Sequence, residues 1–296
     1  MINQHKMHNP LEKIDLKNTD FELVKSSLNG DRIALDKLIK KHQPFIYNVA
    51  WKMSHNPNDA KDLTQEVLIK VITNLSKFSF KSAFPTWLYR IVVNEFLQTK
   101  RKNKNPQFES FEHYGNTLDN IPNPELNKQE EIAYAELSKE MQISCMSGML
   151  MCLNEEQRLI YILGDTFNID HNLGAEIFEI SPQNFRIKLH RSRKELYNFM
   201  NNKCGLVNKA NPCRCPKKTK ALKKIGFLNE NKMLFNVKTA KKIKDFASEN
   251  HVELMETIED KYTLLFRNHP AKKHFGKETI IDELLNDDDL MKHLRP

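Results

Sequence analysis

The sequence is poor in glycine. Only 8 of its 296 residues are glycines, and they form neither a G-x-G-x-x-G motif nor a Walker loop, which argues against a Gly-rich site for nucleotide phosphates. Nucleophile and metal-hydrolase constellations with credible spacing are also missing. The sequence therefore predicts a protein that is not an enzyme.

Long apolar runs are missing too. No run approaches the roughly 20 residues that span a bilayer, and the N-terminal stretch MINQHKMHNPLEKIDLKN lacks the apolar core of a signal peptide. We therefore expect a cytoplasmic protein without a membrane partner. The 5 cysteines are an odd number, and in a reducing compartment a disulfide framework is not expected.

Strand-like alternation is absent over the first two-thirds of the chain, and apolar residues recur at helical spacing instead. Gly30 is a natural helix stop, and Asp31 can cap a following helix that we expect to be bent or interrupted near Pro44. The fold class predicted is all-α. It consists of a helical domain at 20–102, a Pro- and Asn-rich linker at 103–127, a second helical domain at 128–202 and a mostly helical C-terminal extension at 203–296.

The charge of the chain suggests a polyanionic partner. Lys and Arg number 46 against 38 Asp and Glu, a formal net charge of +8, which favours nucleic acid or an anionic membrane surface. The helix predicted within 82–102 has an apolar stripe and, on a different side, Arg90, Asn94, Gln98 and Arg101. Arginine can hold phosphates, and Asn and Gln can read base edges. The alternative is a solvated face that ends in cations suited to the helix dipole.

The loop before this helix combines aromatic rings with small polar and cationic side chains. Phe78, Phe80 and Phe84 surround Lys81 and Ser82. Single-stranded nucleic acid is held by stacking on aromatic faces together with backbone-tracking charge. In the alternative interpretation, the three phenylalanines close a small core.

Residues 170–197 have the pattern of a helix-turn-helix. Ser181 and Pro182 form a strong helix start, and a short helix at about 171–178 precedes them. The second helix of such a motif enters the major groove. Its candidate DNA contacts are Gln183, Asn184, Arg186, Lys188, Arg191 and Arg193.

Two stretches carry a family resemblance. The residues DLTQEV at 62–67, followed by FSFKSAFPTWLYRIVVNEFLQTKRK, resemble region two of bacterial RNA polymerase sigma factors, especially the extracytoplasmic-function (ECF) group. The helix-turn-helix resembles region four of the same group, although Glu179 stands where the family has a small turn residue and Gly174 where it has an apolar one. The resemblance covers about residues 20–200.

The resemblance implies a promoter-specificity subunit. Asp62, Gln65 and Glu66 would bind core polymerase, since they share one helix face. Phe80, Lys81, Ser82, Arg90, Asn94, Gln98 and Arg101 would contact the −10 element, and the second domain would read the −35 element. The implied partners are the polymerase core, through its β′ clamp and β flap, promoter DNA and an anti-sigma factor.

The cysteines of the extension leave other functions open. Cys204, Cys213 and Cys215 form C-x8-C-x-C, and thiolates at this density can bind zinc, with Cys145, Cys152 or a histidine as a fourth ligand. An incidental cysteine-containing turn is the equal alternative, and the rest of the chain predicts no cofactor. Two rival functions remain, a stand-alone helix-turn-helix repressor and a metal or thiol sensor built on Cys204–Cys215. We expect the extension at 203–296 to be regulatory, through its acidic cluster at 282–289. The alternative is a structural role, in which the three cysteines anchor it on the second domain.

Overall fold

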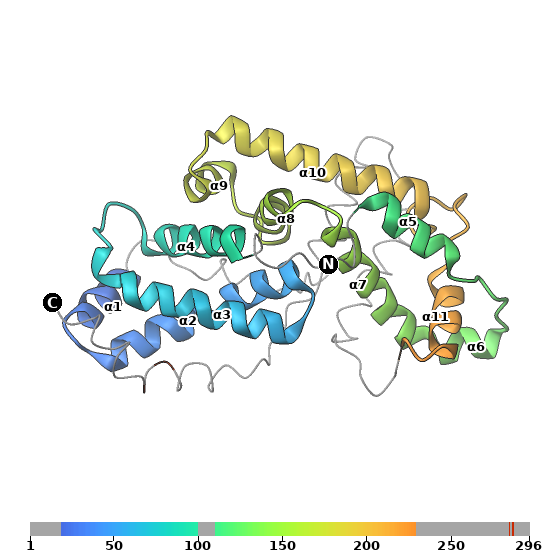
Figure 1. Ribbon diagram of the computed structural model, residues 1–296, viewed down its shortest axis with the longest axis horizontal. Coiled ribbons are helices and arrows are strands. Elements are labelled where there is room, and N and C mark those ends of the chain that lie inside the picture. The colour runs from blue at the N-terminus through green and yellow to red at the C-terminus, as the bar shows by residue number, and fades with distance from the viewer. Residues whose placement is uncertain (1–18, 100–109, 229–283, 285, 287–296) are drawn as a thin grey trace, which may run out of the picture. The chain divides into compact units, whose positions relative to one another are not determined.

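The computed structural model describes residues 19–99, 110–228, 284 and 286 (Figure 1). Within them every regular element is helical, apart from one isolated bridge between Cys204 and Cys213. The prediction of an all-α fold is therefore confirmed. None of the described helices is long and apolar enough to cross a bilayer.

The chain folds as two compact units. Among the described residues, the first unit combines 19–99 with 162–186, and the second combines 110–161 with 187–228. These units differ from the predicted domains, because residues 162–186 group with the N-terminal helices. The aromatic ring of Phe167 is one physical reason, since it is buried and its centroid lies 5.0 Å from that of Phe45.

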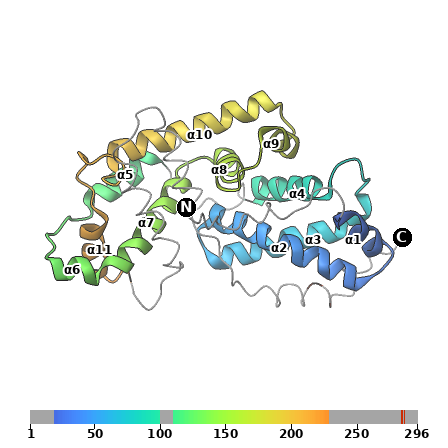
Figure 2. The same cartoon turned by 180° about the vertical axis from the view of Figure 1, so that it is seen from behind.

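The first unit is built from four main helices, which can be followed in Figure 2. They are α1 (Thr19–Leu28), α2 (Arg32–Ser54), α3 (Pro57–Asn74) and α4 (Phe84–Thr99), and a 3-10 turn, η1 (Leu75–Lys77), follows α3. A π-helical turn, η2 (Ile162–Thr166), and α9 (His171–Phe178) complete the unit. Its core contains the fully buried side chains of Phe45, Tyr47, Trp51, Tyr89 and Phe96.

Local sequence signals set the ends of these helices. The Asp31 carboxylate accepts hydrogen bonds from the backbone N–H groups of Ile33 and Ala34, as predicted for an N-cap. His55 ends α2 in the left-handed conformation, and Asn56 caps α3 ahead of Pro57. Helix α2 runs through Pro44 without interruption, so the interrupted form of that expectation is wrong; the side chains on both sides of Pro44 are buried in the core and hold the helix together there.

The second unit contains the remaining helices. They are α5 (Phe111–Asn120), α6 (Lys128–Ala133), α7 (Ala135–Met151), α8 (Glu155–Tyr161), most of α10 (Pro182–Lys203) and α11 (Cys215–Lys224). Helix α5 lies inside the segment that we expected to be a linker. Phe111 and Tyr114 pack against Phe199 with ring centroids 5.2 and 5.8 Å away, so this part of the segment belongs to the core.

Residues 203–228, the start of the predicted extension, are part of the second unit. Leu222 and Leu228 form a buried cluster with Leu137 and Met141 of α7. The buried Lys218 ammonium donates to the carbonyls of Leu118, at 2.6 Å, and of Ile121. The acidic cluster predicted at 282–289 lies almost entirely outside the described residues.

Candidate nucleic-acid interface

The aromatic residues at 78–84 were predicted either to stack on bases or to close a small core, and their exposure distinguishes these two roles. Phe78 and Phe84 are buried at 5% and 4% exposure, whereas Phe80 is 41% exposed. Phe80 also has a positive φ of 56°, a conformation that is uncommon for a bulky residue. Phe78 and Phe84 therefore close a core, and Phe80 is presented to solvent together with the exposed Lys81 and the half-buried Ser82.

A partner for Phe80 comes from α1. The Phe21 ring centroid lies 5.0 Å from that of Phe80, and Phe21 is itself 47% exposed. Sequence reasoning missed Phe21, because 58 intervening positions separate it from Phe80 and a lone aromatic in a short helix normally indicates a core residue. The available signal was that Phe21 lies on the same side of α1 as the charged Glu22 and Lys25, which indicates an exposed position.

The polar side of α4 is only partly free. Asn94 and Gln98 are exposed, as expected for DNA contacts. Arg90 is occupied: its Nε–H donates to the backbone carbonyl of Glu176 in α9 at 2.9 Å, and carboxylate oxygens of Glu176 and Glu179 lie 3.6 and 4.0 Å from its other nitrogens. Arg101 lies outside the described residues.

The predicted polymerase contacts lie on α3. Asp62 and Glu66 are exposed and Gln65 is half-buried, while Leu63, Val67 and Leu68 on the other side of the helix are buried. The structure thus presents these three polar side chains on the outer side of α3, where a partner protein can reach them.

The helix-turn-helix has the expected caps. The Asp170 carboxylate caps α9, and the Ser181 hydroxyl accepts from the Asn184 N–H at 3.2 Å at the start of α10. The turn between them uses Glu179 in the left-handed conformation, with a φ of 55° and its N–H bonded to the Ala175 carbonyl. Glutamate therefore occupies the position at which glycine is favoured on backbone grounds.

Gly174, the second departure from the family pattern, is explained by Phe185. A Cβ atom at 174 would lie 2.5 Å from the Phe185 ring, closer than any real contact. The ring, buried at 0% exposure, fills the space that an apolar side chain at 174 would take. The Phe185 ring therefore packs directly against the backbone of Gly174, and a larger residue at 174 would clash with it.

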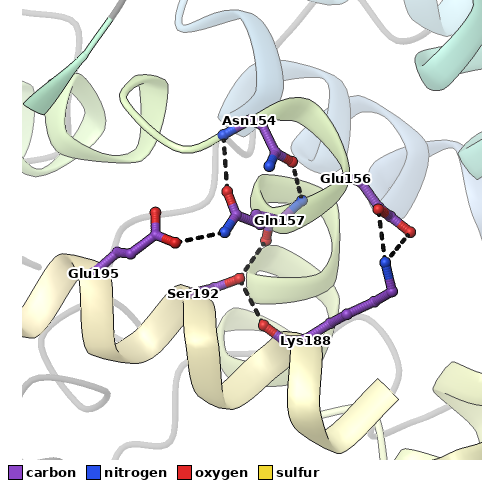
Figure 3. Close-up of polar contacts among 6 residues, drawn as sticks. All are labelled: Asn154, Glu156, Gln157, Lys188, Ser192 and Glu195. Carbon is purple, nitrogen blue, oxygen red and sulfur yellow. Dashed lines mark hydrogen bonds and ion pairs between the residues drawn. The ribbon is translucent and has the colours of Figure 1, made fainter. Parts of the chain in front are cut away.

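The candidate −35 contacts differ in solvent exposure and in whether their side chains already bind a partner. Gln183, Asn184, Arg186 and Arg191 are exposed, and Arg193 is half-buried. Arg186 hydrogen-bonds to the His171 ring. Lys188 is held by α8, since its Nζ donates to both carboxylate oxygens of Glu156 at 3.0 and 2.9 Å (Figure 3).

Helices α8 and α10 are fastened by further polar contacts (Figure 3). The Ser192 hydroxyl, buried between them, donates to the carbonyls of Lys188 at 3.0 Å and Gln157 at 3.3 Å. The Gln157 amide donates to Glu195 at 2.7 Å. This network fixes the rotation of α10 about its axis within the second unit, which decides which cations point outward.

Comparison with known proteins agrees with this geometry. Residues 38–105, which include α3, the loop and α4, match the family described as Sigma-70 region 2. The chain is also 27% identical over 175 residues to "ECF RNA polymerase sigma factor SigE" of Mycolicibacterium smegmatis, a match covering 58% of this chain and 64% of that protein. These matches support an ECF factor of the sigma-70 family.

Two Bacillus subtilis relatives match over most of their own length. "RNA polymerase sigma factor YlaC" is 26% identical over 166 residues, 56% of this chain and 91% of the relative. "ECF RNA polymerase sigma factor SigW" is 24% identical over 177 residues, 58% of this chain and 92% of the relative. These two matches therefore leave more than two fifths of this chain without an aligned counterpart.

All five cysteines of this chain lie in the second unit. Burial raises the pKa of Cys145 and Cys152 to about 12 and the pKa of Cys204, Cys213 and Cys215 above the usual range, and the neighbouring thiols add to the shift at Cys145 and Cys215. Thiols of this kind are poor nucleophiles at neutral pH, which disfavours a redox sensor.

Zinc at Cys204, Cys213 and Cys215 stays a prediction. Within the described residues, no three or more Cys, His, Asp or Glu side chains are arranged to hold a metal ion. Metal binding would also require the buried thiols to lose their protons. Metal analysis of the purified full chain tests the prediction directly.

Proposed function

We propose that the chain is a sigma factor, which joins core RNA polymerase and directs it to promoters for transcription initiation. It contributes recognition and strand opening, and the polymerase performs the chemistry. One observation carries this proposal: the segment that matches Sigma-70 region 2 presents an exposed, strained aromatic at Phe80 beside Lys81, and a capped helix-turn-helix follows in the same chain.

Each surface has a part in this scheme. Asp62, Gln65 and Glu66 bind the polymerase β′ clamp. The loop at 78–82, with Asn94 and Gln98, contacts the opened −10 element, and the N-terminal part of α10 reads the −35 element in the major groove. The second unit also meets the β flap, and an anti-sigma factor is a candidate regulator.

Arg90 can reach DNA only after it leaves Glu176 and Glu179. All three side chains are partly exposed, and exposed ion pairs are worth only about 0–1 kcal/mol. A phosphate group can therefore compete for the guanidinium. Opening of this contact would be coupled to promoter binding in the proposed function.

A stand-alone repressor is the main rival, and reconstitution separates the two. Core RNA polymerase is mixed with fragmented genomic DNA of the source organism, with and without the chain, and the 5′ ends of the transcripts are mapped. We expect new start sites that appear only with the chain and share two upstream sequence motifs.

Matched variants assign the roles. Glu66→Lys, on the exposed side of α3, should abolish the new start sites by preventing assembly with core. Asn184→Ala should change the upstream motif at one base pair, at a cost of about 1–3 kcal/mol. Sequence-specific binding to duplex DNA without core, and no change in transcription with core, would favour the repressor.

A further inference from the structure

Two exposed phenylalanine rings from distant parts of the chain meet on the surface of the first unit. Phe21 of α1 is 47% exposed and Phe80 of the loop is 41% exposed, with centroids 5.0 Å apart and ring planes at 59°. Both are large apolar side chains that folding leaves in contact with water. Exposed aromatic pairs of this kind indicate a binding surface rather than a packing need.

A cluster of aromatic residues beside Phe80 supports the Phe21–Phe80 pair. The buried Phe78 ring lies 4.8 Å from Phe80, and it also contacts Phe84 at 5.6 Å and Trp87 at 5.3 Å. Phe80 therefore packs against a cluster of aromatic rings, and its backbone is held in the left-handed region with a φ of 56°. A strained residue over-determined by its surroundings is typical of a ligand contact.

The surroundings of the pair are suited to a polyanion. Lys81 follows Phe80 directly and is exposed, and Lys77 is exposed in η1. On α1, Lys25 lies four residues after Phe21, so both project from one side of the helix. One exposed carboxylate, Glu22, also lies on α1 beside Phe21. Aromatic faces bordered by cations are the combination that holds single-stranded nucleic acid.

We infer that Phe21 is a second base-stacking residue, which works with Phe80 to hold an unstacked base of single-stranded DNA. The inference rests on the proposed function, and it adds a residue outside the segment 38–105 that matches the family. Two rings at 59° form an open corner rather than a sandwich. A base can stack on the face of one ring and meet the edge of the other, the two geometries that aromatic groups prefer.

The test uses the full chain assembled with core RNA polymerase and a short single-stranded oligonucleotide labelled with aminopurine. Binding is followed by quenching of the aminopurine fluorescence, which reports stacking and not merely proximity. Four substitutions are compared: Phe21→Ala, Phe21→Leu, Phe21→Trp and Phe80→Ala. Phe227→Ala is the matched control, since Phe227 is 72% exposed in the second unit.

Loss of one stacking contact should weaken binding about 30-fold, the middle of the range for a base on an aromatic side chain. We expect this loss for Phe21→Ala and Phe21→Leu, together with reduced quenching. Phe21→Trp should bind like the wild type, and its added tryptophan fluorescence should itself be quenched by the oligonucleotide. Phe227→Ala should change nothing.

Each other outcome overturns the inference. Wild-type binding by Phe21→Ala, or full activity of Phe21→Leu, would show that no aromatic face is needed at 21. If Phe21→Ala unfolds the first unit, absence of quenching in Phe21→Trp decides against stacking. Self-association of the wild type that Phe21→Ala abolishes would assign the pair to a second copy. If the wild-type complex binds no oligonucleotide, the proposed function itself fails.

Discussion

Helices α10 and α11 are both rich in lysine and arginine, but they use these side chains differently. On α10, Arg186 and Arg191 are exposed to solvent. On α11, Lys218 is buried on two backbone carbonyls, and Lys217 and Lys220 reach Glu125 and Glu130 at 2.5 and 2.7 Å. A basic helix therefore does not by itself indicate a DNA-binding surface.

The difference follows from what each helix packs against. The carbonyls of Leu118 and Ile121 lie where α5 ends, and the Lys218 ammonium donates to both, a position for a cation that also suits the helix dipole. In the N-terminal half of α10, Arg186 instead contacts the His171 ring and Lys188 the Glu156 carboxylate, and both partners are side chains. Replacement of a buried lysine should therefore change stability, whereas replacement of an exposed arginine or of an exposed ion-pair partner should change DNA binding.

Replacement of Lys218 should have the largest effect. Lys218→Met removes two charged hydrogen bonds, to the Leu118 carbonyl, which also accepts from the Ile121 N–H at 3.3 Å, and to the Ile121 carbonyl; each is worth about 1.5–3 kcal/mol. We expect a loss of about 3–5 kcal/mol in the free energy of unfolding, measured by urea denaturation. Lys224→Met, at an exposed position of the same helix, is the control and should change stability by less than about 0.5 kcal/mol. Equal stability of the two variants would show that Lys218 does not stabilise the fold, and α11 would then not differ from α10 in the use of its lysines.

Lys52 provides a buried lysine in the first unit. Burial lowers its pKa from 10.5 to about 7, and its Nζ lies 5.4 Å from the centroid of the Trp51 ring. Because the unfolded chain binds more protons between these values, this lysine makes stability rise with pH from about 7 to 10.5. Burial of Lys52 lowers the free energy of unfolding by its full amount below pH 7, and this loss disappears above the pKa of 10.5 in the unfolded chain.

Lys52→Met should remove this dependence. The shift corresponds to about 4 kcal/mol at neutral pH. We expect the variant to be more stable than the wild type at pH 7, with the difference shrinking as pH rises toward 10. Urea denaturation at several pH values measures it. A difference that stays constant with pH would mean that Lys52 is charged in the fold.

Arg191→Ala should leave folding unchanged and weaken DNA binding. Arg191 is exposed on α10, so stability should change by less than about 0.5 kcal/mol. A lost phosphate contact should weaken all DNA sequences alike and reduce the salt dependence of binding by about one ion. Fluorescence anisotropy of the holoenzyme at several salt concentrations measures both. Weakening confined to one base pair would instead assign Arg191 to base reading.

The smallest effect is expected at Glu156. Glu156→Gln removes the negative charge that pairs with Lys188, whose Nζ lies 2.9 Å from the carboxylate. Because both side chains are partly exposed, the pair is worth about 0–1 kcal/mol. DNA affinity should rise by up to about 5-fold at low salt and not at high salt. A lower affinity would show that the ion pair positions Lys188 for DNA.

Sequence patterns were sufficient where the physics is local. Caps at Asp31 and Ser181 were predicted and are present, because a side-chain oxygen and the nearby N–H groups need only a few adjacent residues. The all-α class followed from helical spacing of apolar residues. The outward position of Asp62 and Glu66 followed from the same periodicity. The sites of DNA and polymerase contact remain predictions that the experiments above test.

Tertiary packing decided the rest. Helix α5 carries only a few apolar residues among polar ones, and its apolar side is buried because Phe199, far along the chain, packs against it. No pattern in the chain could indicate that Lys218 would meet carbonyls a hundred residues earlier, or that Glu176 would occupy Arg90. The sequence determined by itself where helices begin, end and turn their apolar sides. The fold alone decided which cations stay exposed and which ring joins Phe80, because both depend on acceptors and surfaces that only long-range packing brings together.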